Sequence, residues 1–170
     1  MSTRHNSILR ATILVWMVLI CLYAVTRYYQ LEWNVSGSMP QRLWFTQIGN
    51  IDLKVGDYVV IKFHDFRMKD PNDFEYVVKQ VGGVAGDNIG VLSWWTGKVK
   101  STNFALNREV YEVYDTLSGN HFTPLTTRNL IIPKGCYFLH GQHQPSFDSR
   151  YKEFGLICKN QIYGKTHPIF

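Results

Sequence analysis

Two residues of the sequence have the chemistry of a nucleophile and its base, namely Ser38 and Lys79. Ser38 lies in the segment VSGSMP at 35–40, where Gly37 allows the backbone to turn sharply and Pro40 fixes its exit. Such a turn exposes the serine side chain. A serine hydroxyl is a poor nucleophile until a neighbouring base takes its proton, and that base must be unprotonated near neutral pH.

Lys79 lies in the run YVVKQV, in which the alternation of a strand directs its side chain to the same face as Val77 and Val81. Apolar surroundings disfavour the ammonium form and lower the pKa of a lysine, which is what a lysine base requires. Taken by itself, Lys79 fits equally well as a strand-edge lysine that protects against aggregation. The choice between these two interpretations depends on the rest of the chain.

Three further segments follow the serine in order: VGDYVVI at 55–61, VVKQVGGVAGDNI at 77–89 and HGQHQPSFDSRY at 140–151. Together with the Ser38 segment they resemble the signal peptidase I family. In that family an S-x-S-M-P segment follows a membrane anchor, and a G-D-x-V strand, a K-R-x-x-G-x-x-G-D segment and a G-D-N-x-x-x-S-x-D-S-R segment come after it. The resemblance implies a serine endopeptidase that removes signal peptides.

The resemblance also implies the roles of individual residues. Ser38 resembles the nucleophile and Lys79 resembles the general base. Ser36 resembles the residue whose hydroxyl acts beside the backbone N–H of Ser38 to form the oxyanion hole. Ser36 is therefore a candidate site residue, and removing one oxyanion donor typically slows such an enzyme by about 100- to 1,000-fold.

Four residues of the last segment resemble the support of the lysine. Ser146 resembles the serine that orients it, and Gly141 resembles the small residue that lets the amine pass close to the backbone. Asp148 and Arg150 resemble an ion pair that braces the segment. Outside this context the pair would be a surface ion pair of little value and Ser146 a turn residue.

The chain departs from the family pattern at Gln80, where Arg is usual, at Ala85, where Pro is usual, and at Gly141-Gln142-His143, where G-D-N is common. None of these changes removes a proposed catalytic atom. The last segment resembles the TraF-like branch, the conjugative-transfer signal peptidases. That branch processes pilin precursors, in some members with cyclisation of the pilin.

Two alternatives to a pilin peptidase follow from the same residues. One is a general type I signal peptidase for exported proteins, and the other is a non-catalytic anchored assembly factor of a conjugative transfer apparatus. For either peptidase, the expected partners are the lipid bilayer and a membrane-inserted precursor with an A-x-A-like cleavage site. Nucleic acid is not an expected partner, because the 18 Lys and Arg are scattered along the chain.

Two rival sites use other residues. Cys136, His140, His143 and Cys158 are metal-ligand types, but their irregular spacing does not match a structural zinc site, so no metal and no cofactor are expected. A Ser-His-Asp triad with His143 and Asp148 stays open, since triads assemble across a fold, yet it leaves the Lys79 segment unexplained. Cys136 and Cys158 fit either a disulfide in an oxidising compartment or two free thiols.

The uncharged stretch ATILVWMVLICLYAV at 11–25 predicts a single transmembrane anchor over 11–29. A cleaved signal peptide is the alternative, but the sequence LYAVTRYYQ that follows the apolar core lacks the small residues of a cleavage site. An intact anchor would hold the rest of the chain at the bilayer surface.

Basic residues set the expected orientation of this anchor. Arg4 and Arg10 precede it, whereas Arg27 alone follows it closely, so the positive-inside rule predicts a cytoplasmic N-terminus at 1–10. Residues 30–170 would then form a peptidase domain on the periplasmic or extracytoplasmic side of the inner, cytoplasmic membrane.

The part of the chain after the anchor predicts strands. Gly and Pro separate short runs of strand character at 57–63, 75–84 and 135–141, and a hairpin-like insertion follows Asp87. Val, Ile, Thr and aromatic residues, which favour strands, are frequent. The predicted fold is mainly β, an antiparallel signal-peptidase-like domain preceded by one transmembrane helix.

Overall fold

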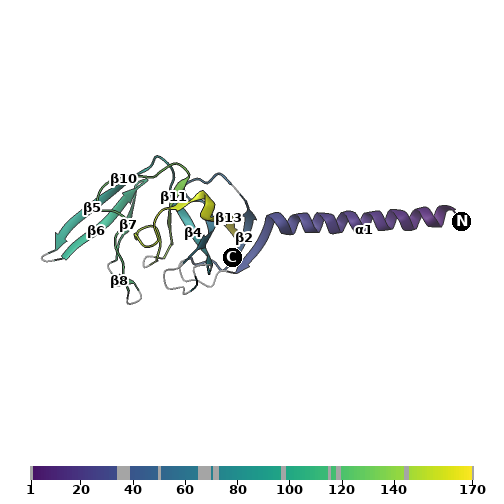
Figure 1. Cartoon of the computed structure of the whole chain (residues 1–170), viewed down its shortest axis with the longest axis horizontal. Coiled ribbons are helices and arrows are strands. Elements are labelled where there is room, and N and C mark those ends of the chain that lie inside the picture. Colours follow the sequence, from purple (N-terminus) through teal and green to yellow (C-terminus); the bar gives the residue numbers. More distant parts are fainter. Residues whose placement is uncertain are drawn as a thin grey trace.

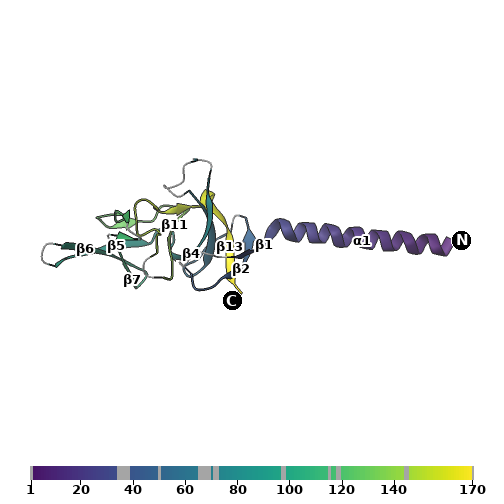
Figure 2. The ribbon, with the colours of Figure 1, turned by 90° about the horizontal axis from the view of Figure 1, so that it is seen from below.

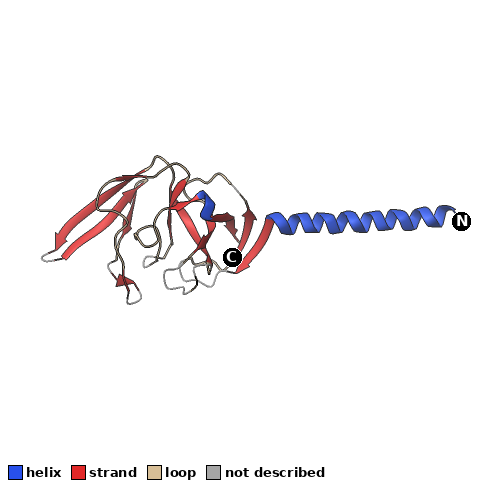
Figure 3. Ribbon diagram, in the orientation of Figure 1, coloured by secondary structure: helices blue, strands red, loops and turns tan. Residues whose placement is uncertain are grey.

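The computed structural model describes residues 2–33, 39–49, 51–64, 70, 73–96, 99–114, 116–117, 120–143 and 146–169. One long helix is followed by a domain of antiparallel strands (Figures 1 and 3). This arrangement confirms the mainly β fold with a single N-terminal helix that the sequence predicts.

Helix α1 (Ser2–Tyr28) projects away from the β domain in both views (Figures 1 and 2). Its 20 residues from Leu9 to Tyr28 have a mean hydropathy of 2.0 and none of them is buried, so the helix is long and apolar enough to cross a membrane. The helix ends one residue before the predicted anchor does. Tyr29 instead begins strand β1, because its backbone pairs with Gln47.

A sheet of seven antiparallel strands forms the body of the domain, in the order β1-β2-β13-β3-β4-β11-β12. Each predicted strand at 57–63, 75–84 and 135–141 is present, shortened by one or two residues at its ends. The short helix η1 (Lys159–Gln161) precedes the last strand. The strands are β1 (Tyr29–Trp33), β2 (Leu43–Ile48), β3 (Tyr58–Phe63), β4 (Glu75–Gly83), β11 (Cys136–His140), β12 (Ile157–Cys158) and β13 (Ile162–Pro168).

A second sheet, in the order β10-β5-β6-β7, extends from the first at the end of the molecule opposite the helix N-terminus (Figures 1 and 2). It contains the predicted hairpin after Asp87. Asn107 and Arg108 both have positive φ, 50° and 69°, as expected for the tight turn between β6 and β7. The strands of this sheet are β5 (Asn88–Thr96), β6 (Val99–Leu106), β7 (Glu109–Glu112) and β10 (Leu130–Ile131). The two other strands, which lie outside this sheet, are β8 (Thr116–Leu117) and β9 (Asn120–His121).

Alternation along β3 and β4 separates two apolar clusters on opposite faces of the larger sheet. Val59 and Val81 belong to the cluster that also contains Leu139 and Phe154. Val60, on the other face, belongs with Val78, Trp44 and Met39 to a smaller cluster. The side chains of β4 therefore enter one core or the other according to their position in the strand.

Two glycines at the end of β4 let the second sheet pack closely against the first. A Cβ added at Gly83 would lie 2.7 Å from Leu106 Cδ2, and one at Gly82 would lie 2.8 Å from the Tyr111 hydroxyl. A side chain at either position would displace these neighbours. The Gly-Gly pair that follows the lysine segment thus has a packing role.

Candidate active site

Lys79 lies within β4, opposite Val59 of β3, and its side chain enters the larger apolar cluster. The residue is only 4% exposed, and its Nζ lies 5.9 Å from the centroid of the Phe154 ring. Burial disfavours the ammonium form and lowers the pKa of Lys79 to about 8, against the opposing effect of the Asp148 carboxylate. At pH 8 a lysine with this pKa is unprotonated in about half of the molecules.

Ser146 is the hydrogen-bond partner of this amine. Lys79 Nζ donates to Ser146 Oγ at 2.8 Å, and the serine is itself 4% exposed. The two residues lie 67 positions apart in the chain. The structure thus brings the two side chains together, and the orienting role of Ser146 stays a prediction.

Asp148 and Arg150 form a buried pair beside Ser146. Arg150 Nε donates to Asp148 Oδ1 at 2.8 Å and its Nη2 donates to Oδ2 at 2.8 Å, while the residues are 2% and 0% exposed. Arg150 Nη2 also donates to the Ser146 carbonyl at 3.1 Å, and Nη1 donates to the carbonyl of Glu112 at 2.9 Å. This bidentate geometry fixes the backbone of the serine that contacts Lys79.

Gly141 is bonded to the same buried Asp148–Arg150 pair. Its backbone N–H donates to Asp148 Oδ2 at 2.9 Å. This bond ties the segment that follows β11 to the Asp148–Arg150 pair. The close approach of the Lys79 amine to Gly141 stays a prediction.

Ser36 and Ser38 lie outside the described residues, but Met39, the next residue along the chain, is described. Met39 is 4% exposed and belongs to the small apolar cluster with Trp44, Val60 and Val78. Val78 precedes Lys79. The sequence neighbours of the two predicted catalytic residues are thus members of one cluster.

The family model described as signal peptidase, peptidase S26, matches residues 4–170 of the chain. The chain belongs to this family. A search of the curated proteins found no match. The family membership makes this protein a serine peptidase of the signal peptidase type, whose substrates are precursor proteins, and it agrees with α1 as a single-pass membrane anchor.

A disulfide in this signal peptidase bears on one rival site. Cys136 of β11 and Cys158 of β12 are bonded to each other across the pair of strands. Because both sulfurs are consumed, neither is a thiolate ligand, which leaves the metal alternative without two of its four ligands.

The two residues of the triad alternative lie in different surroundings. His143 is exposed. Both oxygens of the buried Asp148 instead accept hydrogen bonds from Arg150 and Gly141. The described contacts of Asp148 therefore do not favour a triad with His143.

Gln80 and Gln142, two residues that differ from the common family pattern, are in contact. Gln142 Nε2 donates to Gln80 Oε1 at 3.4 Å and to the Tyr58 hydroxyl at 2.7 Å. The positions that are Arg and Asp in the common pattern are here two amides in contact. The signal peptidase therefore has an uncharged pair beside the Lys79 segment.

Sequence reasoning missed two residues that shape the surroundings of this site. Ser149 Oγ accepts from the Leu139 N–H at 3.0 Å and donates to the Gly155 carbonyl at 2.7 Å, which ties the last motif to β11. Phe154 provides an apolar wall near Lys79 Nζ. Ser149 lay inside the recognised D-S-R motif, whereas nothing in the local sequence indicates the contact of Phe154.

A pocket of about 230 Å³ opens beside the buried Asp148–Arg150 pair. Tyr111, His140 and Arg150 are among its lining residues. Burial lowers the pKa of His140, although the Asp148 carboxylate opposes this shift. Burial and a hydrogen bond to Glu109 raise the pKa of Tyr111. These two rings stack edge to face with centroids 4.9 Å apart, and His140 is favoured in its neutral form.

Proposed function

We propose that this signal peptidase cleaves its precursor with Ser38 as the nucleophile and Lys79 as the general base. The observation that carries the proposal is the buried amine of Lys79, whose pKa is lowered to about 8 and which is bonded to Ser146. A lysine in this state accepts a proton near neutral pH.

The proposed reaction has two stages. Lys79 Nζ takes the hydroxyl proton of Ser38 as Ser38 Oγ attacks the carbonyl carbon of the scissile bond. The Lys79 ammonium then gives this proton to the leaving amine. The Ser38 N–H and the Ser36 hydroxyl stabilise the oxyanion. Water, deprotonated by the same lysine, then hydrolyses the acyl-enzyme and releases Ser38.

Two observations support a domain on the periplasmic side of the inner membrane. Arg4 and Arg10 lie before the apolar helix, which favours a cytoplasmic N-terminus. The Cys136–Cys158 disulfide is typical of an oxidising compartment. An active site there meets precursors as they emerge from the bilayer.

The proposed substrate is a conjugative pilin precursor with small residues at the first and third positions before the cleaved bond. The amide pair of Gln80 and Gln142 supports this choice, because it replaces residues of opposite charge in the common pattern. A general signal peptidase is the second candidate, and an assembly factor without turnover is the third. The intact Ser38 and Lys79 count against the third.

Co-expression of a pilin precursor with the wild-type chain, Ser38→Ala or Lys79→Ala tests this proposal. We expect the mature mass with the wild type and the precursor mass with both variants. Unchanged maturation in both variants would rule out the serine-lysine mechanism. A product lighter by one water would report ring closure, and equal cleavage of an unrelated exported precursor would favour the general peptidase.

A further inference from the structure

We propose that a membrane phospholipid binds where α1 meets the β domain, with its phosphate at Arg27 and one acyl chain along Ile20 and Ala24. This inference rests on the proposed anchoring of α1 in the bilayer. It does not depend on the identity of the nucleophile.

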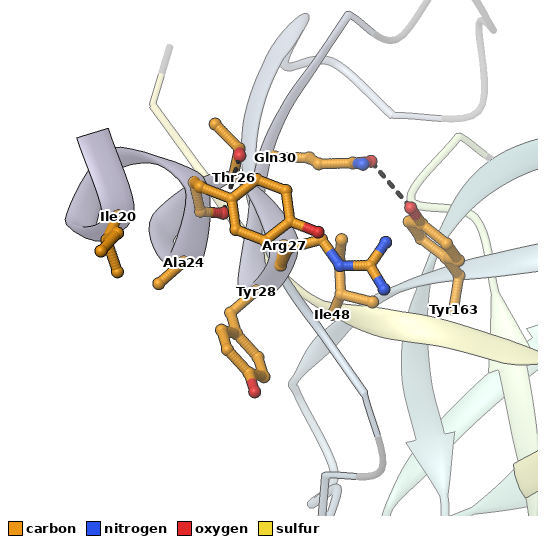
Figure 4. A pocket seen from close by; sticks show the side chains of 9 residues that line it. Ile20, Ala24, Thr26, Arg27, Tyr28, Gln30, Ile48 and Tyr163 are labelled. Carbon is orange, nitrogen blue, oxygen red and sulfur yellow. Dashed lines mark hydrogen bonds between the residues drawn. The ribbon is translucent and has the colours of Figure 1, made fainter. Parts of the chain in front are cut away.

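A pocket of about 540 Å³ opens at this junction. Its α1 wall includes Ile20, Ala24 and Arg27, which are separated by four and three residues and therefore share one face of the helix. Ile48 of β2 and Tyr163 of β13 form the opposite wall (Figure 4). The pocket thus separates the end of the anchor from the first sheet.

The polarity of the pocket changes along its length. Ile20 and Ala24 lie toward the bilayer, whereas Arg27 lies about 10 Å beyond Ile20 and about 4.5 Å beyond Ala24 along the helix axis. At the domain end, the Tyr163 hydroxyl donates to Gln30 Oε1 at 2.8 Å. An apolar end inside the membrane and a polar end at its surface match the two parts of a phospholipid.

Arg27 supplies the positive charge for a phosphate. Its guanidinium points into the space between α1 and Tyr163 (Figure 4), and within the described part of the chain it makes no ion pair with a carboxylate. Glu32 acts electrostatically on the Tyr163 hydroxyl at the domain end of the pocket, and burial raises the pKa of its carboxyl. The planar guanidinium fork suits two phosphate oxygens.

The apolar wall distinguishes a lipid from a free phosphate. An inorganic anion would contact only the Arg27 end and would leave Ile20, Ala24 and Ile48 uncovered. An acyl chain covers these apolar side chains along the membrane end of the pocket. The combined chemistry therefore favours a phospholipid.

Native mass spectrometry of the full chain in detergent, titrated with phosphatidylglycerol, tests the site. We expect Arg27→Gln to weaken lipid binding by about tenfold, which corresponds to about 1.4 kcal/mol. Arg10→Gln, which removes the same charge at the other end of the apolar segment, is the matched control and should bind as the wild type does. Equal binding by the two variants would overturn the proposal.

A second pair of variants tests the acyl-chain end. Ala24→Phe should lower lipid occupancy by filling the pocket, whereas Ala11→Phe, outside it, should not. Displacement of the lipid by millimolar inorganic phosphate would contradict the proposal, because it would make the site a simple anion site. All titrations use a Ser38→Ala background, so that a failure of the catalytic mechanism leaves this measurement unaffected.

Discussion

Lys79 donates a hydrogen bond of 2.8 Å to Ser146, and both side chains are almost completely buried. The bond joins the middle of strand β4 to a segment braced by the Asp148–Arg150 pair. In the proposed mechanism Ser146 orients the amine, and burial in the apolar cluster lowers its pKa. Orientation and a lowered pKa, the two requirements of the proposed lysine base, would then come from different parts of the fold.

Activity should rise with pH through a midpoint near 8. Lys79 acts as a base only when unprotonated, and its pKa is lowered from 10.5 to about 8. Below the midpoint, kcat/KM should fall about tenfold for each pH unit. Measurement of kcat/KM for precursor cleavage from pH 6 to 10 checks this, and a profile that stays flat between pH 6 and 8 would contradict the assignment of Lys79.

Ser146→Ala should lower kcat by about 10- to 100-fold without unfolding the domain, because the lysine amine loses the group that orients it. Ser149→Ala is the matched control. The Ser149 hydroxyl bonds to Leu139 and Gly155, so its loss should reduce the free energy of unfolding by about 1–3 kcal/mol. Its kcat, measured below the melting temperature, should change little; equal losses of kcat in both variants would contradict an orienting role.

Lys79→Met should make the inactive protein more stable than the wild type at pH 7. Below pH 8 the buried lysine is protonated in both the folded and unfolded states, so the folded state bears the full cost of the buried ammonium. Between pH 8 and 10.5 the folded state loses its proton first, and the stability of the wild type rises. The difference between the variants should therefore disappear as pH increases to 10.5.

The magnitude of that difference follows from the shift of the Lys79 pKa. A change from 10.5 to about 8 corresponds to about 3 kcal/mol at pH 7, reduced by the loss of the bond to Ser146. Chemical denaturation at pH 7 and pH 10 measures it. A variant less stable than the wild type at pH 7 would show that the buried ammonium is not costly.

Much of this arrangement was accessible from sequence, for reasons that are local. The alternation in YVVKQV placed Lys79 on an apolar face, and the strand boundaries followed Gly and Pro. The contact between Lys79 and Ser146 could be predicted only from the family resemblance, because the two residues are 67 positions apart in the chain. The disulfide and the contact of Phe154 with Lys79 depend on how β11, β12 and the segment between them pack. Hydrophobic periodicity in the sequence does not predict this packing.

Reduction of the Cys136–Cys158 disulfide should destabilise the site. The bond closes a loop of 22 residues that contains Gly141, Ser146 and the Asp148–Arg150 pair. The chain-entropy relation predicts a loss of about 3 kcal/mol on reduction. Thermal melts of the Cys136→Ser/Cys158→Ser double variant measure it, with Cys21→Ser in α1 as the control; equal melting temperatures in the two variants would contradict the effect.

The most direct test of the serine-lysine mechanism is the rate of precursor cleavage by the full chain in proteoliposomes at pH 8.5. Ser38→Ala should show no cleavage above background, while Ser36→Ala should retain cleavage that is about 100- to 1,000-fold slower, as expected for an oxyanion donor. Lys79→Met should also be inactive in the folded protein. Cleavage by Ser38→Ala at the wild-type rate would contradict the central claim.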